Sequence, residues 1–264
     1  MSGRSVQCVT CRVCLSVVLA TAALGCRSMP TPEPPAVSRP VGVTPVFAGR
    51  WETLGTSVEG RPIRAWTAGT GARRLLFLGA IHGDEQTTRE PMDDVIAHLE
   101  AHPERLRDVH LVVIPVVNPD GFEVDSRRNA NGVDLNRNFP TRGFLPSDRH
   151  GRTGGSEPEV ETLVALIERL QPELIVTVHA PEGCVDYDGP GAETAARISR
   201  ISGLPVRRLG ARANSLGRWA GLERGIPTIT LELRRDLPHS PEERRRVEAA
   251  LLSVLETGET PAAK

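Results

Sequence analysis

Two kinds of hydrophobic pattern alternate along the chain from about residue 63 onwards. The first kind is a short and almost continuous apolar run, which is typical of a β-strand that is covered on both faces. Such runs predict strands over residues 63–68, 74–80, 109–117, 173–179 and 227–233. Because strands that alternate with helices are typical of α/β proteins, the runs predict a member of that class.

The second kind of pattern is a helical stripe, in which apolar residues recur every three or four positions. Residues 92–99 contain one stripe, built from a methionine, a valine, an isoleucine and a leucine. Ser156 with Glu159, and Ser240 with Glu243, have the spacing of capping boxes and precede two further stripes. The helices and strands together predict a three-layer α/β/α sandwich.

The first 25 residues have the features of an export signal. Arg4 and Arg12 precede an apolar stretch over residues 13–25 that is too short to remain as a membrane-spanning helix. The stretch ends at Cys26, in a context that resembles the lipidation site of a bacterial lipoprotein. We therefore expect a signal peptide over 1–25 and a lipid on Cys26, which would anchor the exported protein to a membrane facing the periplasm. Ordinary signal cleavage and an uncleaved start are the alternatives.

A proline-rich stretch follows Cys26 and is typical of an extended tether. No second linker and no internal repeat follows, so we expect a tether over 26–46 and one folded domain over 47–264. The other early cysteines lie inside the predicted signal, which leaves Cys184 as the one free thiol of the domain. A disulfide framework is therefore not expected.

The composition argues against one class of function, which is binding to nucleic acid. The 264 residues are 39% hydrophobic and 25% charged, as in an ordinary soluble globular protein, and the formal net charge is −1. A net charge near zero provides no general attraction to nucleic acid or to an anionic membrane. We therefore expect no nucleic-acid partner, and membrane contact only through the lipid anchor. The composition predicts no particular oligomeric state.

Candidate metal ligands follow two of the predicted strands. His82 and Glu85 come directly after the strand over 74–80, and His179 ends the strand over 173–179. Sites in α/β sheets lie beyond the carboxyl ends of the strands, so these side chains are placed where they can meet. Two histidines and one carboxylate leave the fourth position of a zinc ion open for water, as in a catalytic site. A solvated loop is the alternative for an isolated His-x-x-Glu pair.

A long polar segment lies between these candidate ligands, over residues 118–139. It is rich in glycine, asparagine and arginine and is too long for a plain turn between a strand and a helix. Long ordered loops in compact domains are usually functional. The arginines and asparagines of this segment could hold a carboxylate through paired hydrogen bonds.

At these residues the chain resembles carboxypeptidase A-type zinc peptidases, whose motifs it carries in the same order. The motifs are His82-x-x-Glu85, Asn118-Pro119-Asp120-Gly121, residues 132–139, His179 and Glu232. Residues 179–181, 185–189, 214–217 and 225–227 look most like the murein peptide amidase A branch of that family. That branch cleaves the bond between γ-D-glutamate and meso-diaminopimelate in peptidoglycan peptides. The resemblance covers residues 54–233 and implies a mixed, mostly parallel central sheet.

The resemblance also implies how one Zn²⁺ ion would be held. His82, Glu85 and His179 would be its ligands. Asp134 would accept a hydrogen bond from His82 and thereby orient its ring. A turn aspartate is the alternative for Asp134. Glu232 would be the general base that assists the attack of water, with a surface glutamate at a strand end as the alternative.

Two further roles follow from the same resemblance. Arg127 would stabilise the oxyanion on the scissile carbonyl, and Arg128 is the competing assignment. Asn136 and Arg137 would bind the free carboxylate of the leaving group. Separately from the resemblance, Asp186, Tyr187 and Asp188 follow His179 closely enough to line the pocket, where they could meet the amino group of diaminopimelate. An ordinary turn is the alternative for residues 186–188.

We therefore expect a zinc-dependent peptidase or amidase that hydrolyses a C-terminal amide bond in cell-wall peptides. Two other functions remain open from the sequence. One is an N-acyl amino acid deacylase of the succinylglutamate desuccinylase and aspartoacylase type, which also uses His-x-x-Glu and a later histidine. The other is a lipoprotein that binds peptidoglycan without cleaving it. The segments 118–121 and 132–139 favour the peptidase over the deacylase.

Overall fold

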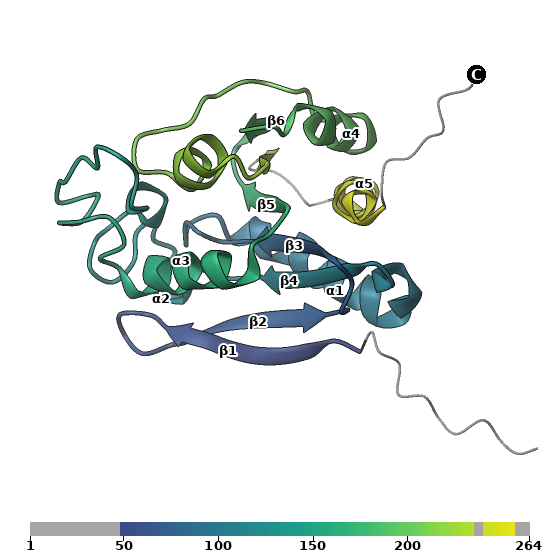
Figure 1. Ribbon diagram of the computed structural model, residues 1–264, viewed down its shortest axis with the longest axis horizontal. Coiled ribbons are helices and arrows are strands. Elements are labelled where there is room, and N and C mark those ends of the chain that lie inside the picture. The colour runs from purple at the N-terminus through teal and green to yellow at the C-terminus, as the bar shows by residue number, and fades with distance from the viewer. Residues whose placement is uncertain (1–47, 235–239, 257–264) are drawn as a thin grey trace, which may run out of the picture. The chain divides into compact units, whose positions relative to one another are not determined.

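A seven-stranded sheet forms the centre of the folded domain (Figure 1). The computed structural model describes residues 48–234 and 240–256, so the predicted signal peptide, the tether and Cys26 lie outside the described residues. The strands are β1 (Arg50–Thr56), β2 (Pro62–Ala68), β3 (Arg73–Leu78), β4 (Val109–Ile114), β5 (Leu174–His179), β6 (Glu182–Asp188) and β7 (Thr228–Arg234). The α-helices are α1 (Arg89–Ala101), α2 (Pro119–Glu123), α3 (Pro158–Leu170), α4 (Ala192–Ser202) and α5 (Pro241–Leu252). Short helical turns are η1 (Gln86–Thr88), η2 (Pro103–Leu106), η3 (Leu135–Arg137), η4 (Gly217–Leu222) and η5 (Ser253–Leu255).

The sheet is mixed and mostly parallel, as predicted. Its strand order is β1-β2-β4-β3-β5-β7-β6. The central strands β4, β3, β5 and β7 run parallel to one another, whereas β1, β2 and β6 are antiparallel to their neighbours. The carboxyl ends of the parallel strands therefore meet at one edge, which is where such sheets place their sites.

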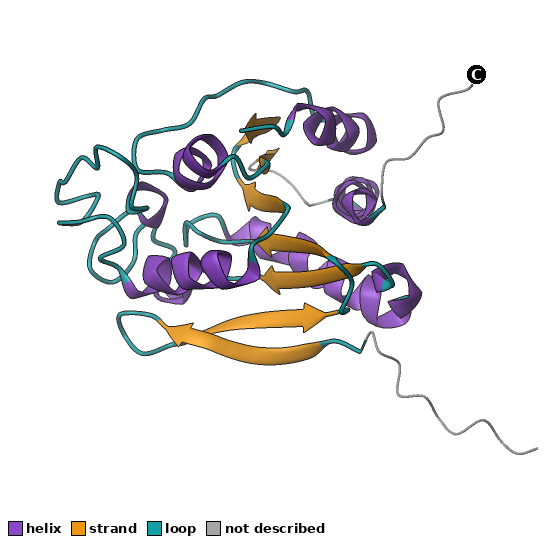
Figure 2. Ribbon diagram, viewed as in Figure 1, coloured by secondary structure: helices purple, strands orange, loops and turns teal. Residues whose placement is uncertain are grey.

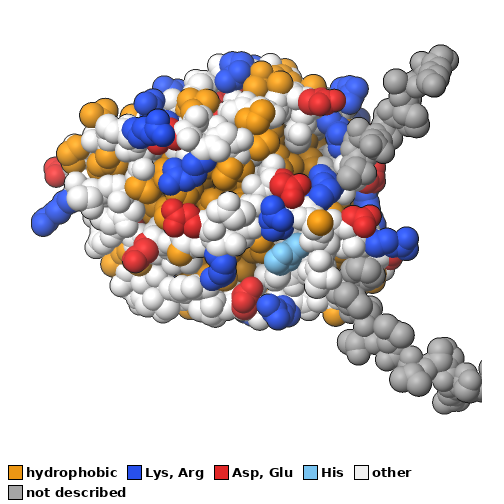
Figure 3. Space-filling view, viewed as in Figure 1, with side chains coloured by type: hydrophobic (Ala, Val, Ile, Leu, Met, Phe, Trp, Pro, Cys, Tyr) orange, Lys and Arg blue, Asp and Glu red, His pale blue; other side chains and the backbone are white. Residues whose placement is uncertain are grey.

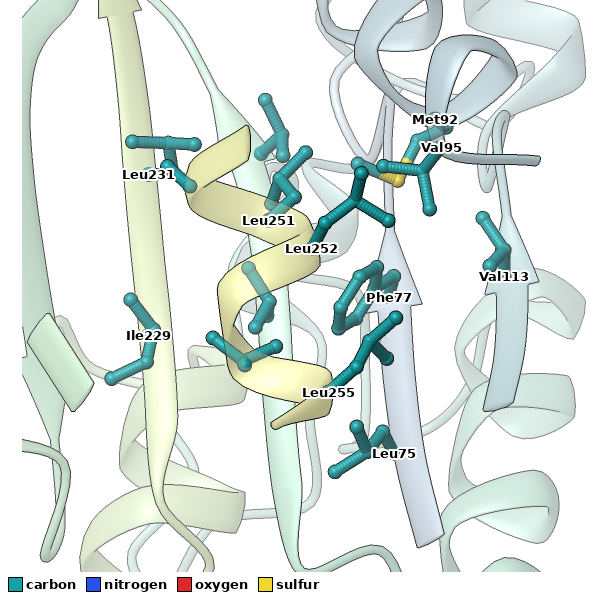
Figure 4. Packing of buried hydrophobic residues seen from close by; sticks show 14 of the residues in the cluster. Leu75, Phe77, Met92, Val95, Val113, Ile229, Leu231, Leu251, Leu252 and Leu255 are labelled. Atoms are coloured by element: carbon teal, nitrogen blue, oxygen red, sulfur yellow. The ribbon is translucent and has the colours of Figure 1, made fainter. Parts of the chain in front are cut away.

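Helices cover both faces of this sheet, which confirms the three-layer α/β/α arrangement (Figures 1 and 2). One hydrophobic core joins the sheet to α1, α4 and α5, and the other joins it to α3 and η4. In Figure 4 the side chains of Leu252 and Leu255 lie close to Phe77 of β3. The last helix of the described chain thus completes the core on one face.

A truncation in this core is expected to cost much stability. Leu251 has no exposed surface, so Leu251→Ala leaves a cavity in place of the contacts that it removes. We expect the free energy of unfolding to fall by about 2–5 kcal/mol in urea denaturation. Leu222→Ala is the control, because Leu222 is 55% exposed, and it should change stability by less than about 0.5 kcal/mol. Equal losses in the two variants would contradict this packing.

Two strands and two α-helices were not predicted from the sequence, namely β1, β6, α2 and α4. β1 is an edge strand whose residues are exposed or half-buried, so it lacks an apolar run.

The predicted cap at Ser240 is confirmed, because its side chain accepts a hydrogen bond from the Glu243 amide at 3.1 Å. The predicted cap at Ser156 is wrong. α3 begins one residue later than that box requires, and the hydroxyl of Ser156 donates to Glu157 instead.

Charged side chains of both signs are interspersed on the face shown in Figure 3. This distribution agrees with the formal net charge of −1. Within residues 48–234 and 240–256, every helix is too short or too polar to cross a membrane.

Candidate active site

The turn after β3 carries two of the candidate ligands and is supported by the motif at 118–121. Gly83 lies between His82 and Glu85 and packs directly on the backbone of that motif. A Cβ atom on Gly83 would lie 2.0 Å from the carbonyl carbon of Gly121. Only glycine allows so close an approach of two backbones. The two motifs are therefore parts of one structural unit that positions His82 and Glu85.

The structure brings the three predicted metal ligands together at the carboxyl edge of the sheet. One potential ligand atom from each of His82, Glu85 and His179 lies within 4.8 Å of the others. The Glu85 carboxylate lies between the rings, with Oε1 2.7 Å from Nδ1 of His82 and Oε2 2.9 Å from Nδ1 of His179. All three side chains are buried.

Asp134 determines how the ring of His82 is oriented. Its Oδ1 lies 3.1 Å from Nε2 of His82, and its Oδ2 accepts a hydrogen bond from Nε of Arg127 at 3.1 Å. The backbone amide of Asn136 also donates to Asp134, which caps η3 and fixes the carboxylate in place. A proton on Nε2 of His82 leaves the lone pair of Nδ1 directed at Glu85, as a metal ligand requires.

The charges of this cluster fit a bound zinc ion. Burial acts to raise the pKa of Glu85, but His179 and His82 hold it well below the usual range. The pKa of Asp134 is also low, because His82 and Arg127 outweigh the effect of burial. Two buried carboxylates therefore remain ionised beside two imidazoles. Nitrogen and carboxylate donors in a His₂Glu set are those that zinc takes in catalytic sites.

Removing the partner of His82 should weaken metal binding. In Asp134→Ala, Nε2 of His82 loses its acceptor, and the ring is no longer held with Nδ1 toward Glu85. We expect zinc affinity to fall by about 10- to 100-fold, measured by competition with a chromophoric chelator. Asp148→Ala, at an exposed loop position, is the control and should bind zinc like the parent protein. Unchanged affinity in Asp134→Ala would remove Asp134 from this role.

Glu232 faces the cluster from β7. It pairs with His179 of β5 on one side and with Cys184 of β6 on the other. The amide of Glu182 donates a long hydrogen bond of 3.5 Å to Oε2. Burial, together with the charge of Glu85, raises the pKa of Glu232. A carboxylate with a raised pKa beside a candidate metal site is suited to accepting and returning a proton.

The structure distinguishes Arg127 from its neighbour Arg128. Arg127 lines the pocket, and its Nη1 lies 3.4 Å from Oε1 of Glu85. Arg128 is absent from the described pocket lining, and its carbonyl oxygen accepts a hydrogen bond from the hydroxyl of Ser126. The geometry therefore favours Arg127 as the arginine that reaches a reacting carbonyl.

Asn136 and Arg137 lie together in the same pocket. Oδ1 of Asn136 accepts a hydrogen bond from the amide of Leu216 at 3.0 Å, which holds the side chain in place. The guanidinium of Arg137 has no carboxylate partner within the described part of the chain. Burial and the nearby charges of Arg127 and Arg212 lower its pKa. A guanidinium in these surroundings would gain by binding an anion.

These residues line a pocket of about 460 Å³ that extends from the three candidate metal ligands to β6. Asp186 and Asp188 lie in its lining, but Tyr187 does not. Side chains alternate between the two faces of a strand, so the ring of Tyr187 packs against the core on the opposite face, beneath Arg208. The expectation that Tyr187 lines the pocket is therefore wrong in this structure.

Comparison with known proteins supports the relationship that the motifs imply. The sequence profile of the zinc carboxypeptidase family matches residues 48–189. The chain belongs to the zinc carboxypeptidase family. It is accordingly a hydrolase, and the family depends on zinc.

Several relatives of this zinc carboxypeptidase are similar over most of their length. Murein peptide amidase A of Escherichia coli (strain K12) is 33% identical over 215 residues, which cover 74% of this chain and 86% of that protein. Murein peptide amidase A of Vibrio campbellii (strain ATCC BAA-1116) is 33% identical over 203 residues, covering 69% and 78%. The zinc carboxypeptidase described here is thus similar to murein peptide amidases along most of both chains.

Solved structures agree with this assignment. The crystal structure of murein-tripeptide amidase from Escherichia coli O157 matches with a TM-score of 0.60 and 26% identity, covering 79% of this chain and 92% of that one. Carboxypeptidase A from Helicoverpa armigera matches with a TM-score of 0.65, covering 80% of this chain and 67% of that one. Its identity of 19% shows a shared fold alone.

Thr177, Gly217 and Arg212 are among the pocket residues of this zinc carboxypeptidase that were not predicted as site residues from the sequence. Thr177 could have been found, because it precedes His179 by two positions on the same strand and therefore shares its face. Arg212 and Gly217 lie on the segment before β7 and around η4. Residues 214–217 contribute to the family resemblance, but nothing in their local pattern indicates that they line the pocket. Their positions depend on how that segment folds back over the sheet.

Proposed function

We propose that this zinc carboxypeptidase hydrolyses peptidoglycan-derived peptides at the bond between γ-D-glutamate and a C-terminal meso-diaminopimelate. The observation that carries the proposal is Arg137, a guanidinium without a carboxylate partner in the described chain, in the same pocket as His82, Glu85 and His179. A guanidinium that lacks a carboxylate partner, next to the candidate zinc ligands, suits a substrate whose leaving group ends in a carboxylate. Similarity to murein peptide amidases over most of their length supports the choice of peptide.

The roles of the metal-site residues follow from their positions. His82, Glu85 and His179 would hold one zinc ion. When bound, zinc would supply Lewis acidity that polarises the scissile carbonyl and makes water more acidic. Glu232, which pairs with His179 across β5 and β7, would take a proton from the attacking water and pass it to the leaving amine. Its raised pKa suits both steps, because the acid that forms must be stable long enough to give the proton back.

The remaining residues would bind and polarise the substrate. Arg127 would donate hydrogen bonds to the oxyanion that develops on the scissile carbonyl. Asn136 and Arg137 would bind the free carboxylate of the leaving residue. This clamp restricts cleavage to the last residue of a chain, because an internal residue has no free carboxylate at that position. Asp186 lies deeper in the same pocket and would contact the side chain of that last residue.

Incubation with L-Ala-γ-D-Glu-meso-diaminopimelate tests the proposal directly. We expect free diaminopimelate to be released, release to stop in the presence of a zinc chelator, and activity to return when zinc is restored. The products are separated by chromatography after derivatisation of their amines. Release that is insensitive to the chelator would contradict the zinc mechanism. An inert tripeptide, with turnover only of an α-linked dipeptide or an N-acyl amino acid, would contradict the proposed substrate.

We also propose that the enzyme is exported and anchored to a membrane through a lipid on Cys26, facing the periplasm. The apolar stretch over 13–25 and the proline-rich stretch over 26–46 support this proposal. Metabolic labelling with a radioactive fatty acid should mark the full-length protein. Cys26→Ser should lose the label and leave the membrane fraction, whereas Cys184→Ser should keep both. A labelled Cys26→Ser protein would contradict the proposed anchor.

A further inference from the structure

The loop between Arg127 and Asp134 carries two groups of the candidate active site. Arg127 lines the pocket, and Oδ1 of Asp134 lies 3.1 Å from the ring of His82. The residues between them belong to no helix or strand. A loop places its side chains less precisely than a helix or strand does, unless other groups fix it. The positions of Arg127 and Asp134 therefore depend on what anchors this loop.

Asn129 closes the loop into a turn. Its backbone amide donates to the carbonyl oxygen of Val133, and its own carbonyl oxygen accepts from the amide of Gly132. Its side-chain Oδ1 accepts from the amides of Asn131 and Val133 at 3.1 and 3.0 Å. Asn129 is only 5% exposed. Hydrogen bonds from one buried residue thus determine the shape of the turn.

The side-chain amide of Asn129 attaches this turn to the start of α3. Nδ2 donates to Oε2 of Glu157 at 2.7 Å and to Oε2 of Glu159 at 3.1 Å. Both glutamates are buried, and Glu159 has no exposed surface. Burial raises the pKa of Glu159, whereas the hydrogen bond from Asn129 lowers it. Because an unpaired acceptor is costly to bury, both carboxylates hold this amide in place.

Glu159 also contacts the turn between β1 and β2. Its Oε1 accepts a hydrogen bond from the amide of Val58 at 3.3 Å. In the same turn, the hydroxyl of Ser57 donates to the buried carboxylate of Asp120 at 2.7 Å. Glu159 therefore lies where α3, the β1–β2 turn and the turn closed by Asn129 meet. The nitrogen of Asn129 joins its own turn to this junction.

We propose that Asn129 is a positioning residue whose hydrogen bonds to Glu157 and Glu159 place the two active-site groups of the loop. Displacement of Arg127 by about 1 Å could lower the rate by about 10²-fold. Displacement of Asp134 would loosen the candidate zinc ligand that it orients. Asn129 itself is absent from the described pocket lining. The inference rests on the proposed function, which gives Arg127 and Asp134 their roles, and deepens it.

Asn129→Asp tests this role with almost no change in side-chain volume. The aspartate keeps the oxygen that shapes the turn but replaces the donor with a second oxygen, which Glu157 and Glu159 would repel. We expect kcat for the tripeptide to fall by about 10²-fold and zinc affinity by about 10-fold. Asn131 also donates to Glu157, but from an exposed position where water can replace it. Asn131→Asp is therefore the matched control and should behave like the parent protein.

A second substitution exchanges donor and acceptor and separates positioning from a merely structural role. In Asn129→Asp/Glu159→Gln, the glutamine amide can donate to the aspartate, while its oxygen can still accept from Val58. We expect kcat to recover by at least about 10-fold relative to Asn129→Asp, together with most of the zinc affinity. A residue that only stabilises the fold would change the midpoint of urea unfolding but neither kcat nor zinc affinity of the folded protein. That result in Asn129→Asp, or no recovery in the double variant, would overturn the proposal.

One further variant and the zinc measurement cover the remaining outcomes. If Asn129→Asp does not fold, Asn129→Ser replaces it, because a hydroxyl can still accept from the amides of the turn but the amide that joins the two carboxylates is gone. It should show the same losses, and parent values would overturn the proposal. If the parent protein does not hydrolyse the tripeptide, the proposed function fails, and zinc affinity alone decides the role of Asn129. Parent zinc affinity in the folded variant would then overturn that role.

Discussion

Replacing Glu232 with glutamine should lower kcat by about 10²- to 10⁴-fold while zinc remains bound. Glutamine has almost the same shape but cannot take a proton from water or return one to the leaving amine. Glu232 lies beside His179 in the register of β5 and β7 but is outside the group of three potential ligands, so its loss should spare the metal. Activity on the tripeptide and zinc content after dialysis are the two measurements.

The pH profile offers an independent check on the same residue. The base must be ionised to accept a proton, so activity should fall as pH drops through the pKa of Glu232. Burial raises that pKa, so the acid limb should lie at a higher pH than an ordinary glutamate would give. The limb should be present in the parent protein and absent from the residual activity of Glu232→Gln. Glu173→Gln, at an exposed glutamate that pairs with Arg74, should behave like the parent. A Glu232→Gln enzyme of normal kcat would remove Glu232 from the mechanism.

Replacing His179 with alanine should abolish both zinc retention and activity. His179 supplies one of three ligands, and its Nδ1 lies 2.9 Å from the carboxylate of Glu85. Without this ring, His82 and Glu85 alone would hold the ion. We expect zinc affinity to fall by more than about 100-fold, because loss of a ligand should exceed the loss caused by a ligand's orienting partner. Metal analysis of the dialysed protein measures this change.

A second histidine provides the control for this experiment. His102 is more than half exposed at the end of α1, and His102→Ala should retain zinc and activity. A His179→Ala protein that keeps a full complement of zinc would contradict the proposed ligand set. A protein that loses zinc but retains activity would contradict the zinc mechanism.

Much of the fold and the three candidate metal ligands could be predicted from the sequence, because the patterns that indicate them involve residues close together in the chain. Apolar runs indicate the buried parallel strands, since both faces of each strand pack against helices. His82 and Glu85 are three residues apart in one turn, so few arrangements of the chain could separate them. The edge strand β1 could not be predicted in this way, because its side chains lie mostly at the surface and carry no apolar run.

The pocket lining from β6 illustrates what a local pattern leaves out. Sequence proximity to His179 predicts that residues 186–188 approach the site, but not which of them face it. β6 presents Asp186 and Asp188 to the pocket and turns Tyr187 to the core, because alternate side chains point to opposite faces. The alternation tells which residues face the pocket only once the segment is known to be a strand. Because β6 was not predicted, the sequence alone could not show that Tyr187 faces the core.

The amino-acid sequence by itself predicted the α/β/α class, the candidate metal ligands His82, Glu85 and His179, and the family. These follow from short-range spacing and from motif order, which do not depend on exact packing. Tertiary structure alone decided that Arg127 rather than Arg128 lines the pocket. It also decided that Gly217 lies against Asp188 across η4 and β6. Both outcomes depend on strand register and on the path of loops over the sheet, which arise from contacts between residues far apart in the chain.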